Sequence, residues 1–397
     1  MKEPYAAALF SKAALGLGYH PFPMPSANLS EPYTNPEGVS LHACVYCGFC
    51  ERFACERYAK SSPQTIILLA LRQIANFEPR YNCQVLKINL DNTGRKATGV
   101  TYADAAGKEF EQPAELVLLT AFALNNVRLL LLSGIGRPYD PQTNDGVVGR
   151  NYSYQTVSGA DVFYDERVNI NPFMGSGAIG NIIDDFSGDN FDHGPHRFIG
   201  GAYIGSNMTG GRPIEFHPVP PGTPAWGAGL KEAVRGSYNH TATLFTHGTS
   251  TSSRANYLDL DPTYKDAWGL PLLRMTFDFP DNDIRMSAFC TEKLMEIGRA
   301  MGGKTVAGVP RKRPYNATVY QSTHNTGGAV MGADPKTSVV NRYLQSWDVP
   351  NLFVVGASAY PQNASYNPTG TLGALTYWVA DALKTKYLRS PEPLVPS

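Results

Sequence analysis

The sequence has no excess of charge of either sign, because 34 lysine and arginine residues balance 34 aspartate and glutamate residues. A protein that binds nucleic acid through its phosphates needs a basic surface, so this composition argues against a nucleic-acid binder. Long hydrophobic runs are also lacking, since Asn125, Asn126 and Arg128 separate the longest candidates, residues 116–124 and 129–132. A membrane-spanning helix needs about 20 consecutive apolar residues, and the sequence therefore predicts none.

A secretory leader is not recognisable either. Residues 1–18 contain a weak apolar stretch broken by Lys12, and no cleavage site of small residues follows a clean apolar segment. We therefore expect a helix that ends near Gly16 and Gly18 in place of a signal peptide. With 397 residues, the chain can bury a core without disulfide bonds, and 38 glycines and 30 prolines indicate a globular, turn-rich protein.

Cysteine is scarce and unevenly placed, since four of the six cysteines fall within residues 44–55. The spacing C-x2-C-x2-C-x4-C groups these thiols in one loop, which favours an iron–sulfur cluster, with structural zinc, disulfides or free thiols as alternatives. The candidate metal ligands are Cys44, Cys47, Cys50 and Cys55. Cys83 and Cys290 lie in apolar patterns, and we expect both to be buried and unreactive.

Hydrophobic periodicity outlines an α/β (α+β) chain. It predicts helices over residues 63–76, 126–133, 284–301 and 370–386. Strand patterns predict a three-stranded antiparallel meander over residues 82–119 and a buried strand from residue 351. Between residues 149 and 310, alternating aromatic and polar runs separated by Gly, Pro and Asn clusters predict a large antiparallel sheet.

Three separated segments resemble the glucose–methanol–choline (GMC) flavoprotein oxidoreductases. AELVLLTAFALNNVRLLLLSGIG at 114–136 is similar to the family's apolar strand, flavin-side turn and following helix. The segment 323–358, which begins THNTGGAVMG, resembles the family's catalytic histidine region and the flavin-contacting strand after it. NPTGTLGALTYWVADAL at 367–383 resembles the terminal segment that reaches the flavin, and VVGRN at 147–151 resembles the entry to the substrate domain.

The resemblance implies a partial GMC fold, with a remnant of an FAD/NAD(P)-binding-like domain and a large antiparallel-sheet substrate domain. It covers nearly the whole chain from residue 65 onward. The implied divisions are an N-terminal helix with the cysteine loop (1–62), part of the FAD-binding domain (63–148), the substrate domain (149–320), and the catalytic histidine segment with the return to the FAD-binding domain (321–397).

One family feature is lacking, namely the G-x-G-x-x-G loop whose amides bind the FAD pyrophosphate. The start at Met1 resembles the interior of a longer family member. We therefore expect that roughly the first third, including the nucleotide-binding part, is missing or is supplied by a second polypeptide, and that FAD affinity is poor without it.

Hydride transfer from an alcohol needs a base at the hydroxyl proton and a flavin at the carbinol carbon. His324, in a Thr-His-Asn-Thr-Gly-Gly loop, is the candidate base, and Asn367 stands where family members carry His or Asn. The resemblance implies flavin contacts from Val85, Ala121, Phe122, Ala123, Gly356, Ala357, Pro368 and Thr369. Phe122 and Ala123 depart from the common glycine, and Gly356 stands where many relatives have Asp.

The cysteine spacing narrows the resemblance to the branch that includes gluconate 2-dehydrogenase and fructose dehydrogenase. This implies a 3Fe-4S cluster, for which three of the four thiolates suffice. The function implied is FAD-dependent oxidation of an alcohol group in a sugar acid, sugar or polyol, with gluconate to 2-dehydrogluconate as the leading reaction. The alternative is a non-catalytic truncated homologue whose cysteine loop holds a structural metal.

The same resemblance implies an electron route from substrate through FAD and the cluster to a multihaem cytochrome c subunit. It also implies a small export-chaperone subunit that carries the signal for export. The expected location is the periplasm, peripheral to the inner membrane through these partner subunits.

Overall fold

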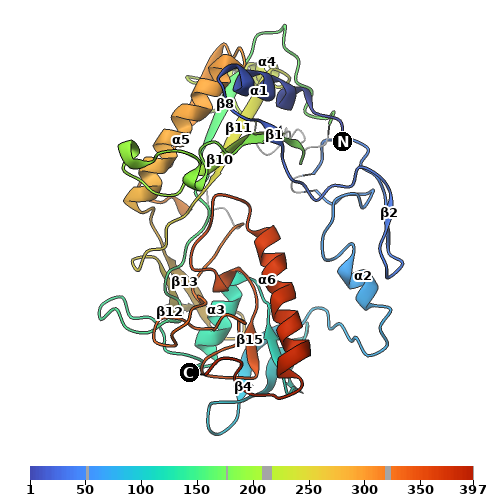
Figure 1. Cartoon of the computed structure of the whole chain (residues 1–397), viewed down its shortest axis with the longest axis vertical. Helices are drawn as coiled ribbons and strands as arrows, with labels where there is room; N and C mark the ends of the chain where they lie inside the picture. Colours follow the sequence, from blue (N-terminus) through green and yellow to red (C-terminus); the bar gives the residue numbers. More distant parts are fainter. Residues whose placement is uncertain (51–52, 176–177, 208–216, 318–322, 397) are drawn as a thin grey trace. The chain divides into compact units, whose positions relative to one another are not determined.

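The computed structural model describes residues 1–50, 53–175, 178–207, 217–317 and 323–396. Contacts divide the chain into two compact units, and each unit combines three stretches of sequence (Figure 1). Unit 1 comprises Met1–Pro79, Thr156–Gly248 and Ile284–Arg311, and unit 2 comprises Arg80–Gln155, Thr249–Asp283 and Lys312–Ser397. The four sequence divisions named above follow other boundaries and stay a prediction.

Unit 1 is built on a six-stranded sheet in the order β1-β9-β10-β11-β8-β14, and every neighbouring pair is antiparallel. Its strands are β1 (Phe22–Pro23), β8 (Gly159–Phe163), β9 (Gly180–Ile183), β10 (Ala202–Asn207), β11 (Thr241–Gly248) and β14 (Thr305–Val309). This agrees with the antiparallel sheet predicted from the alternating runs. One predicted strand differs, because β13 (Pro271–Thr276) pairs with β12 (Tyr257–Lys265) in a separate two-stranded sheet.

Alternate residues of this sheet point to a core shared with two helices, as the two-residue side-chain period of a strand requires. Val162, Ile204 and Leu244 are fully buried there together with Phe10 and Leu294. The helices are α1 (Tyr5–Gly16) and α5 (Asp281–Ala300). The predicted end of the first helix near Gly16 is confirmed, and α5 begins three residues before its predicted start.

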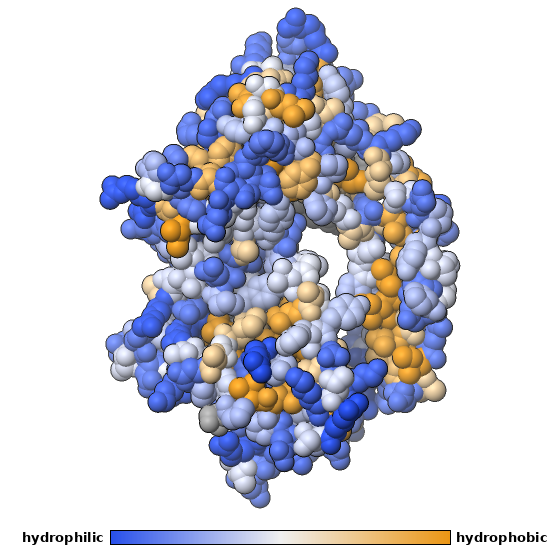
Figure 2. Space-filling view, in the orientation of Figure 1, coloured by the Kyte–Doolittle hydropathy of each residue, from blue (hydrophilic) through white to orange (hydrophobic). Residues whose placement is uncertain are grey.

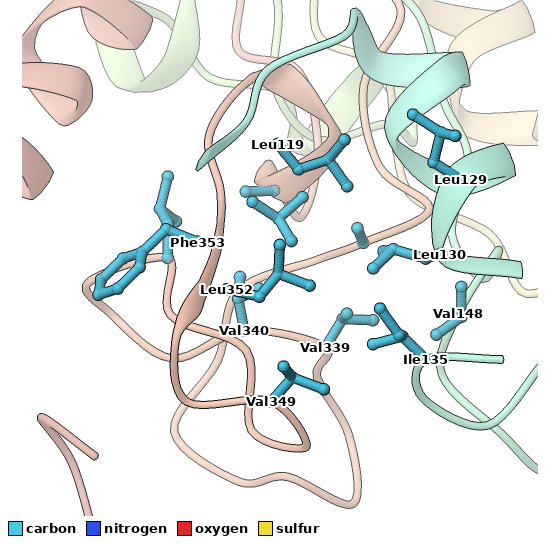
Figure 3. Packing of buried hydrophobic residues seen from close by; sticks show 14 of the residues in the cluster. Leu119, Leu129, Leu130, Ile135, Val148, Val339, Val340, Val349, Leu352 and Phe353 are labelled. Carbon is cyan, nitrogen blue, oxygen red and sulfur yellow. The ribbon is translucent and has the colours of Figure 1, made fainter. Parts of the chain in front are cut away.

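The core of unit 2 surrounds two short parallel strands, β7 (Val117–Leu119) and β15 (Leu352–Val354). Leu130 of α3 (Ala123–Leu132) and Phe353 are fully buried in this core, which Figure 3 shows from close by. The other elements of the unit include the meander β4 (Gln84–Leu90), β5 (Ala97–Ala103) and β6 (Glu109–Pro113), the β12–β13 pair, the 3-10 helix Ala357–Ala359, and α6 (Thr369–Ala382) with the π-helix Leu383–Tyr387 after it.

The structure corrects three sequence predictions about the N-terminal third of the chain, and the first concerns a helix. The predicted helix over 63–76 is only α2 (Ile67–Leu71), and none of its residues is buried. Hydrophobic side chains of α2 remain at the surface, as Figure 2 shows. Tertiary packing supplies most of a helix's stability in proteins, so an apolar pattern without a partner surface supports only a short helix.

The apolar segment 116–119 was expected to close the meander, but it leaves that sheet and pairs in parallel with β15. Cys83 is partly exposed, so the prediction that it is buried is wrong, whereas Cys290 is buried as expected. In the described parts of the chain, no helix has the length and hydropathy needed to cross a membrane.

Candidate active site and cysteine hollow

The carboxyl ends of β7 and β15 lie side by side because the two strands pair in parallel. One buried side chain, that of Asn126 in α3, forms hydrogen bonds with both of the turns that follow these strands. Its Oδ1 accepts a hydrogen bond from the Ala121 N–H at 2.7 Å, and its Nδ2 donates to Ser358 Oγ at 3.0 Å. Nδ2 also donates to the carbonyl of Val355 at 3.4 Å. The crevice beyond the carboxyl ends of parallel strands is where such sheets bind cofactors.

Two of the residues that depart from the family pattern, Phe122 and Gly356, have positive φ angles at these turns. Phe122 has φ 74° and its side chain is half exposed, so α3 begins from a strained turn. Gly356 has φ 146°, a conformation that favours glycine. A Cβ there would also lie 3.2 Å from Asn126 Nδ2, which leaves little room for the aspartate common among relatives.

The loop that carries His324 is held against the same turns. Backbone groups of Thr326 and Ser153 exchange two hydrogen bonds, and the Gly327 N–H donates to the carbonyl of Ala357 at 3.1 Å. The His324 carbonyl accepts a hydrogen bond from Asn363 Nδ2 at 2.7 Å. The structure therefore brings the predicted base loop to the segment that contains Gly356 and Ala357.

His324 itself adopts a left-handed backbone conformation, with φ 64°. Its Nδ1 lies 2.9 Å from Thr323 Oγ1. Burial lowers the pKa of the His324 imidazole below its ordinary value, so the neutral ring is favoured. A neutral imidazole can accept a proton, which is the property required of a general base.

Asn367 and Pro368 line a cavity of about 460 Å³ in unit 2. Its wall is mostly apolar, and it also includes Tyr360, Asn363 and Trp378. The Tyr360 hydroxyl donates to the Pro368 carbonyl at 3.2 Å, which fixes the entry to α6. Pro368 precedes the first helical residue, Thr369. His324 does not line this cavity, and its link to the wall runs through Asn363.

Several supporting residues were missed by the sequence reasoning. Asn126 and Asn363 are both completely buried, and a third, Gln155, donates from Nε2 to the carbonyl of Tyr366 at 2.8 Å. A buried amide side chain produces no periodic pattern in the sequence. Its structural role depends on hydrogen bonds to backbone groups that are far away in the sequence. Val85 lies in β4 of the meander, a different sheet from the one formed by β7 and β15.

In unit 1, all four clustered cysteines line one hollow of about 580 Å³. Nitrogen donors surround three of the sulfurs. Tyr46 N–H donates to Cys44 Sγ at 3.3 Å, and Asn28 Nδ2 donates to Cys50 Sγ at 3.5 Å. Burial raises the pKa of the Cys55 thiol, but backbone N–H groups from Lys60, Arg57 and Ala59 outweigh it, and the net pKa is lowered.

These donors suit thiolate ligands, since N–H groups stabilise negative sulfur. Among the residues that the structure describes, no three His, Cys, Asp or Glu side chains converge on one point as a single metal ion requires. The thiols instead lie around a hollow with room for a group of several atoms. The donor chemistry therefore fits an iron–sulfur cluster, in which different cysteines bind different irons.

Comparison with known proteins adds a second line of support. Two family profiles described as GMC oxidoreductase match residues 34–157 and 251–376. The gluconate 2-dehydrogenase flavoprotein of Pantoea cypripedii is 54% identical over 99% of this chain and 64% of that protein. The fructose dehydrogenase large subunit of Gluconobacter japonicus is 26% identical over 96% of this chain and 66% of that subunit.

Solved structures share the fold at much lower identity. Formate oxidase superposes with a TM-score of 0.62 at 16% identity, covering 96% of this chain and 70% of that one. Pyridoxine 4-oxidase from Mesorbium loti gives a TM-score of 0.60 at 16% identity, with the same coverage. The chain thus spans about 64% of the Pantoea flavoprotein's length.

Proposed function

Because this chain belongs to the GMC oxidoreductase family, we propose that it is an FAD-dependent dehydrogenase that oxidises an alcohol group of a sugar acid, sugar or polyol. Gluconate, oxidised to 2-dehydrogluconate, is the leading substrate. The observation that carries this choice is the 54% identity to the Pantoea gluconate 2-dehydrogenase flavoprotein over nearly the whole chain.

Residues around the ends of β7 and β15, together with Val85 of β4 and the first residues of α6, would hold the flavin. The proposed contacts are Val85, Ala121, Phe122, Ala123, Gly356, Ala357, Pro368 and Thr369. When bound, FAD would supply the acceptor for the hydride that leaves the carbinol carbon. The absence of a side chain at Gly356, where φ is 146°, supports this role, because main-chain groups can approach a planar cofactor closely where no side chain intervenes.

His324 removes the hydroxyl proton of the substrate. In the tautomer whose Nδ1–H donates to Thr323 Oγ1, Nε2 carries no hydrogen, and we assign Nε2 in that tautomer to receive the proton. Loss of the hydroxyl proton and of one hydride converts the alcohol to a carbonyl, so the reaction balances. We assign to Asn367 the positioning of this hydroxyl, to which its side-chain amide can donate a hydrogen bond.

The cysteines Cys44, Cys47, Cys50 and Cys55 provide the thiolates from which a 3Fe-4S cluster would take its ligands. When bound, the cluster would supply single-electron transfer between the flavin and a multihaem cytochrome c subunit. A small export-chaperone subunit and a periplasmic location complete this proposal. The relative described as a large subunit supports the expectation of partner subunits.

A second candidate is a non-catalytic homologue whose cysteine loop holds zinc structurally. The C-x2-C-x2-C-x4-C spacing motivates this candidate, whereas the described thiols lie around a hollow and do not converge on one point as zinc requires. Optical spectroscopy of the chain, supplied with a nucleotide-binding part and FAD, separates the two. Flavin bands together with the broad brown absorption of an iron–sulfur cluster are expected, whereas a colourless zinc protein would contradict the dehydrogenase proposal.

A further inference from the structure

We propose that Cys44, Cys50 and Cys55 are the cluster ligands and that Cys47 is the spare thiol. This inference rests on the proposed function, because it assumes that the cysteine loop binds an iron–sulfur cluster. The cysteine spacing alone does not distinguish the three ligands from the spare thiol.

The three proposed ligands share a common support, the paired segments 27–29 and 59–61. Asn28 and Lys60 form a β-bridge, and the backbone of Leu29 donates to the carbonyl of Ala59 at 2.9 Å. The Cys44 N–H in turn donates to the Leu29 carbonyl at 3.0 Å. The base of the loop is thereby joined directly to these segments.

Lys60 fixes the other end of the loop. Its Nζ donates to the carbonyls of Cys50 at 2.6 Å and Phe53 at 2.7 Å. The backbone N–H of Lys60 also lies near the Cys55 sulfur. The Lys60 ammonium is thus bound to the backbone of Cys50 and close enough to Cys55 to act on its charge, so it would offset the negative charge of a thiolate-bound cluster.

Nitrogen groups near the sulfurs distinguish the same three cysteines from the fourth. Cys44 and Cys50 each accept a hydrogen bond from an N–H group, and backbone N–H groups of Arg57, Ala59 and Lys60 lie near the Cys55 sulfur. Within the described chain, Cys47 Sγ accepts none, and Cys47 is exposed. Such N–H donors orient ligand sulfurs and stabilise their charge, as supporting contacts do in other metal sites.

Cys47 lines the same hollow but is anchored to a different segment. Its backbone forms a bridge with Gly175, and the Gly175 N–H donates to the Tyr46 carbonyl at 3.0 Å. The next residue, Gly48, packs so closely that a Cβ would lie 2.6 Å from the Pro172 carbonyl oxygen. Residues 46–48 are therefore held by 172–175, and not by the segments that support the other three thiols.

The test compares serine variants of the four loop cysteines and of one control cysteine, in the full chain, after anaerobic reconstitution with iron and sulfide. Cys47→Ser should keep the iron content, the acid-labile sulfide and the electron paramagnetic resonance signal of the parent. Cys44→Ser, Cys50→Ser and Cys55→Ser should each lose most of the iron and the signal. Cys83→Ser, which changes a cysteine outside the loop, is the matched control and should behave like the parent.

A measurement on the unaltered protein guards against variants that fail to fold. In the reconstituted chain, iodoacetamide should alkylate Cys47 as fast as in the iron-free chain, while Cys44, Cys50 and Cys55 are protected. Loss of the cluster in Cys47→Ser would overturn the ligand assignment but not the proposed cluster. Protection of Cys47, with alkylation of another loop cysteine, would do the same. A parent chain that binds zinc or no iron would overturn the proposed cluster together with the assignment.

Discussion

Asn126 is the residue on which the geometry of the candidate active site depends most. It is fully buried and joins the turn after β7 to the segment after β15 through hydrogen bonds to backbone and side-chain groups. A buried amide that satisfies several partners is costly to remove, because each partner then loses its hydrogen bond away from water.

Asn126→Ala should therefore lower the free energy of unfolding by about 2 kcal/mol or more. The neighbouring Asn125 is exposed, so Asn125→Ala should change it by only about 0.5 kcal/mol. Denaturant unfolding of both variants measures the difference. Equal stabilities would show that the Asn126 hydrogen bonds do not hold the two turns together.

The pKa of His324 makes a prediction about pH. Burial lowers this pKa below the ordinary value of about 6.5, so the basic form persists at lower pH than for an exposed histidine. As pH falls, kcat/KM should stay high until it passes through the lowered pKa, and the acid limb should have its midpoint below about pH 6.5. Asn367→Ala should keep this limb. A midpoint above pH 6.5 in both proteins would contradict His324 as the base.

At the scale of elements, sequence patterns predicted helices and strands correctly where one face of the element packs into a hydrophobic core. The helix α5 and the strands of the six-stranded sheet followed their predicted periods because alternate residues pack into one cluster. The helix α2 was overestimated because its apolar residues pack against nothing that buries them. The fate of segment 116–119 was missed because a continuous apolar run does not reveal its pairing partner, which lies more than two hundred residues away at β15.

The His324 loop depends on a glycine that sequence patterns leave ambiguous. Gly327 has φ 81°, and a Cβ there would lie 2.1 Å from the Asn151 carbonyl oxygen. Gly94 has a similar φ of 71° in a turn, but a Cβ there meets nothing within 4 Å. An alanine at Gly94 would therefore meet only the backbone strain of a positive φ, whereas an alanine at Gly327 would meet that strain and a steric clash.

Gly94→Ala should cost about 1 kcal/mol through the unfavourable backbone conformation alone. Gly327→Ala should cost clearly more, about 3 kcal/mol or above, because the loop must also move away from Asn151. Thermal unfolding of the two variants gives the comparison. Equal losses would mean that the loop tolerates the added methyl group and is not held as described.

For the whole molecule, the sequence motifs predicted candidate residues for the chemistry but not the residues that support them. His324, Asn367 and the flavin-side turns were predicted from three segments far apart in the chain, and unit 2 contains them all. The amides that connect those segments, Asn126 and Asn363, could not be predicted, because their partners are backbone groups set by the tertiary fold. The cysteine spacing likewise predicted a grouped set of thiols without ranking them.

The central claim is that this chain oxidises a polyhydroxy acid with His324 as the base. Stopped-flow measurement of flavin reduction by gluconate under anaerobic conditions tests it most directly, on FAD-loaded parent, His324→Ala, Asn367→Ala and the exposed-histidine control His20→Ala. We predict that gluconate bleaches the flavin of the parent and of His20→Ala at equal rates. His324→Ala should be slower by roughly a hundredfold to ten-thousandfold at unchanged flavin content, and Asn367→Ala should lose less. Flavin reduction in His324→Ala as fast as in the parent, or a parent flavin that gluconate leaves oxidised, would contradict the account.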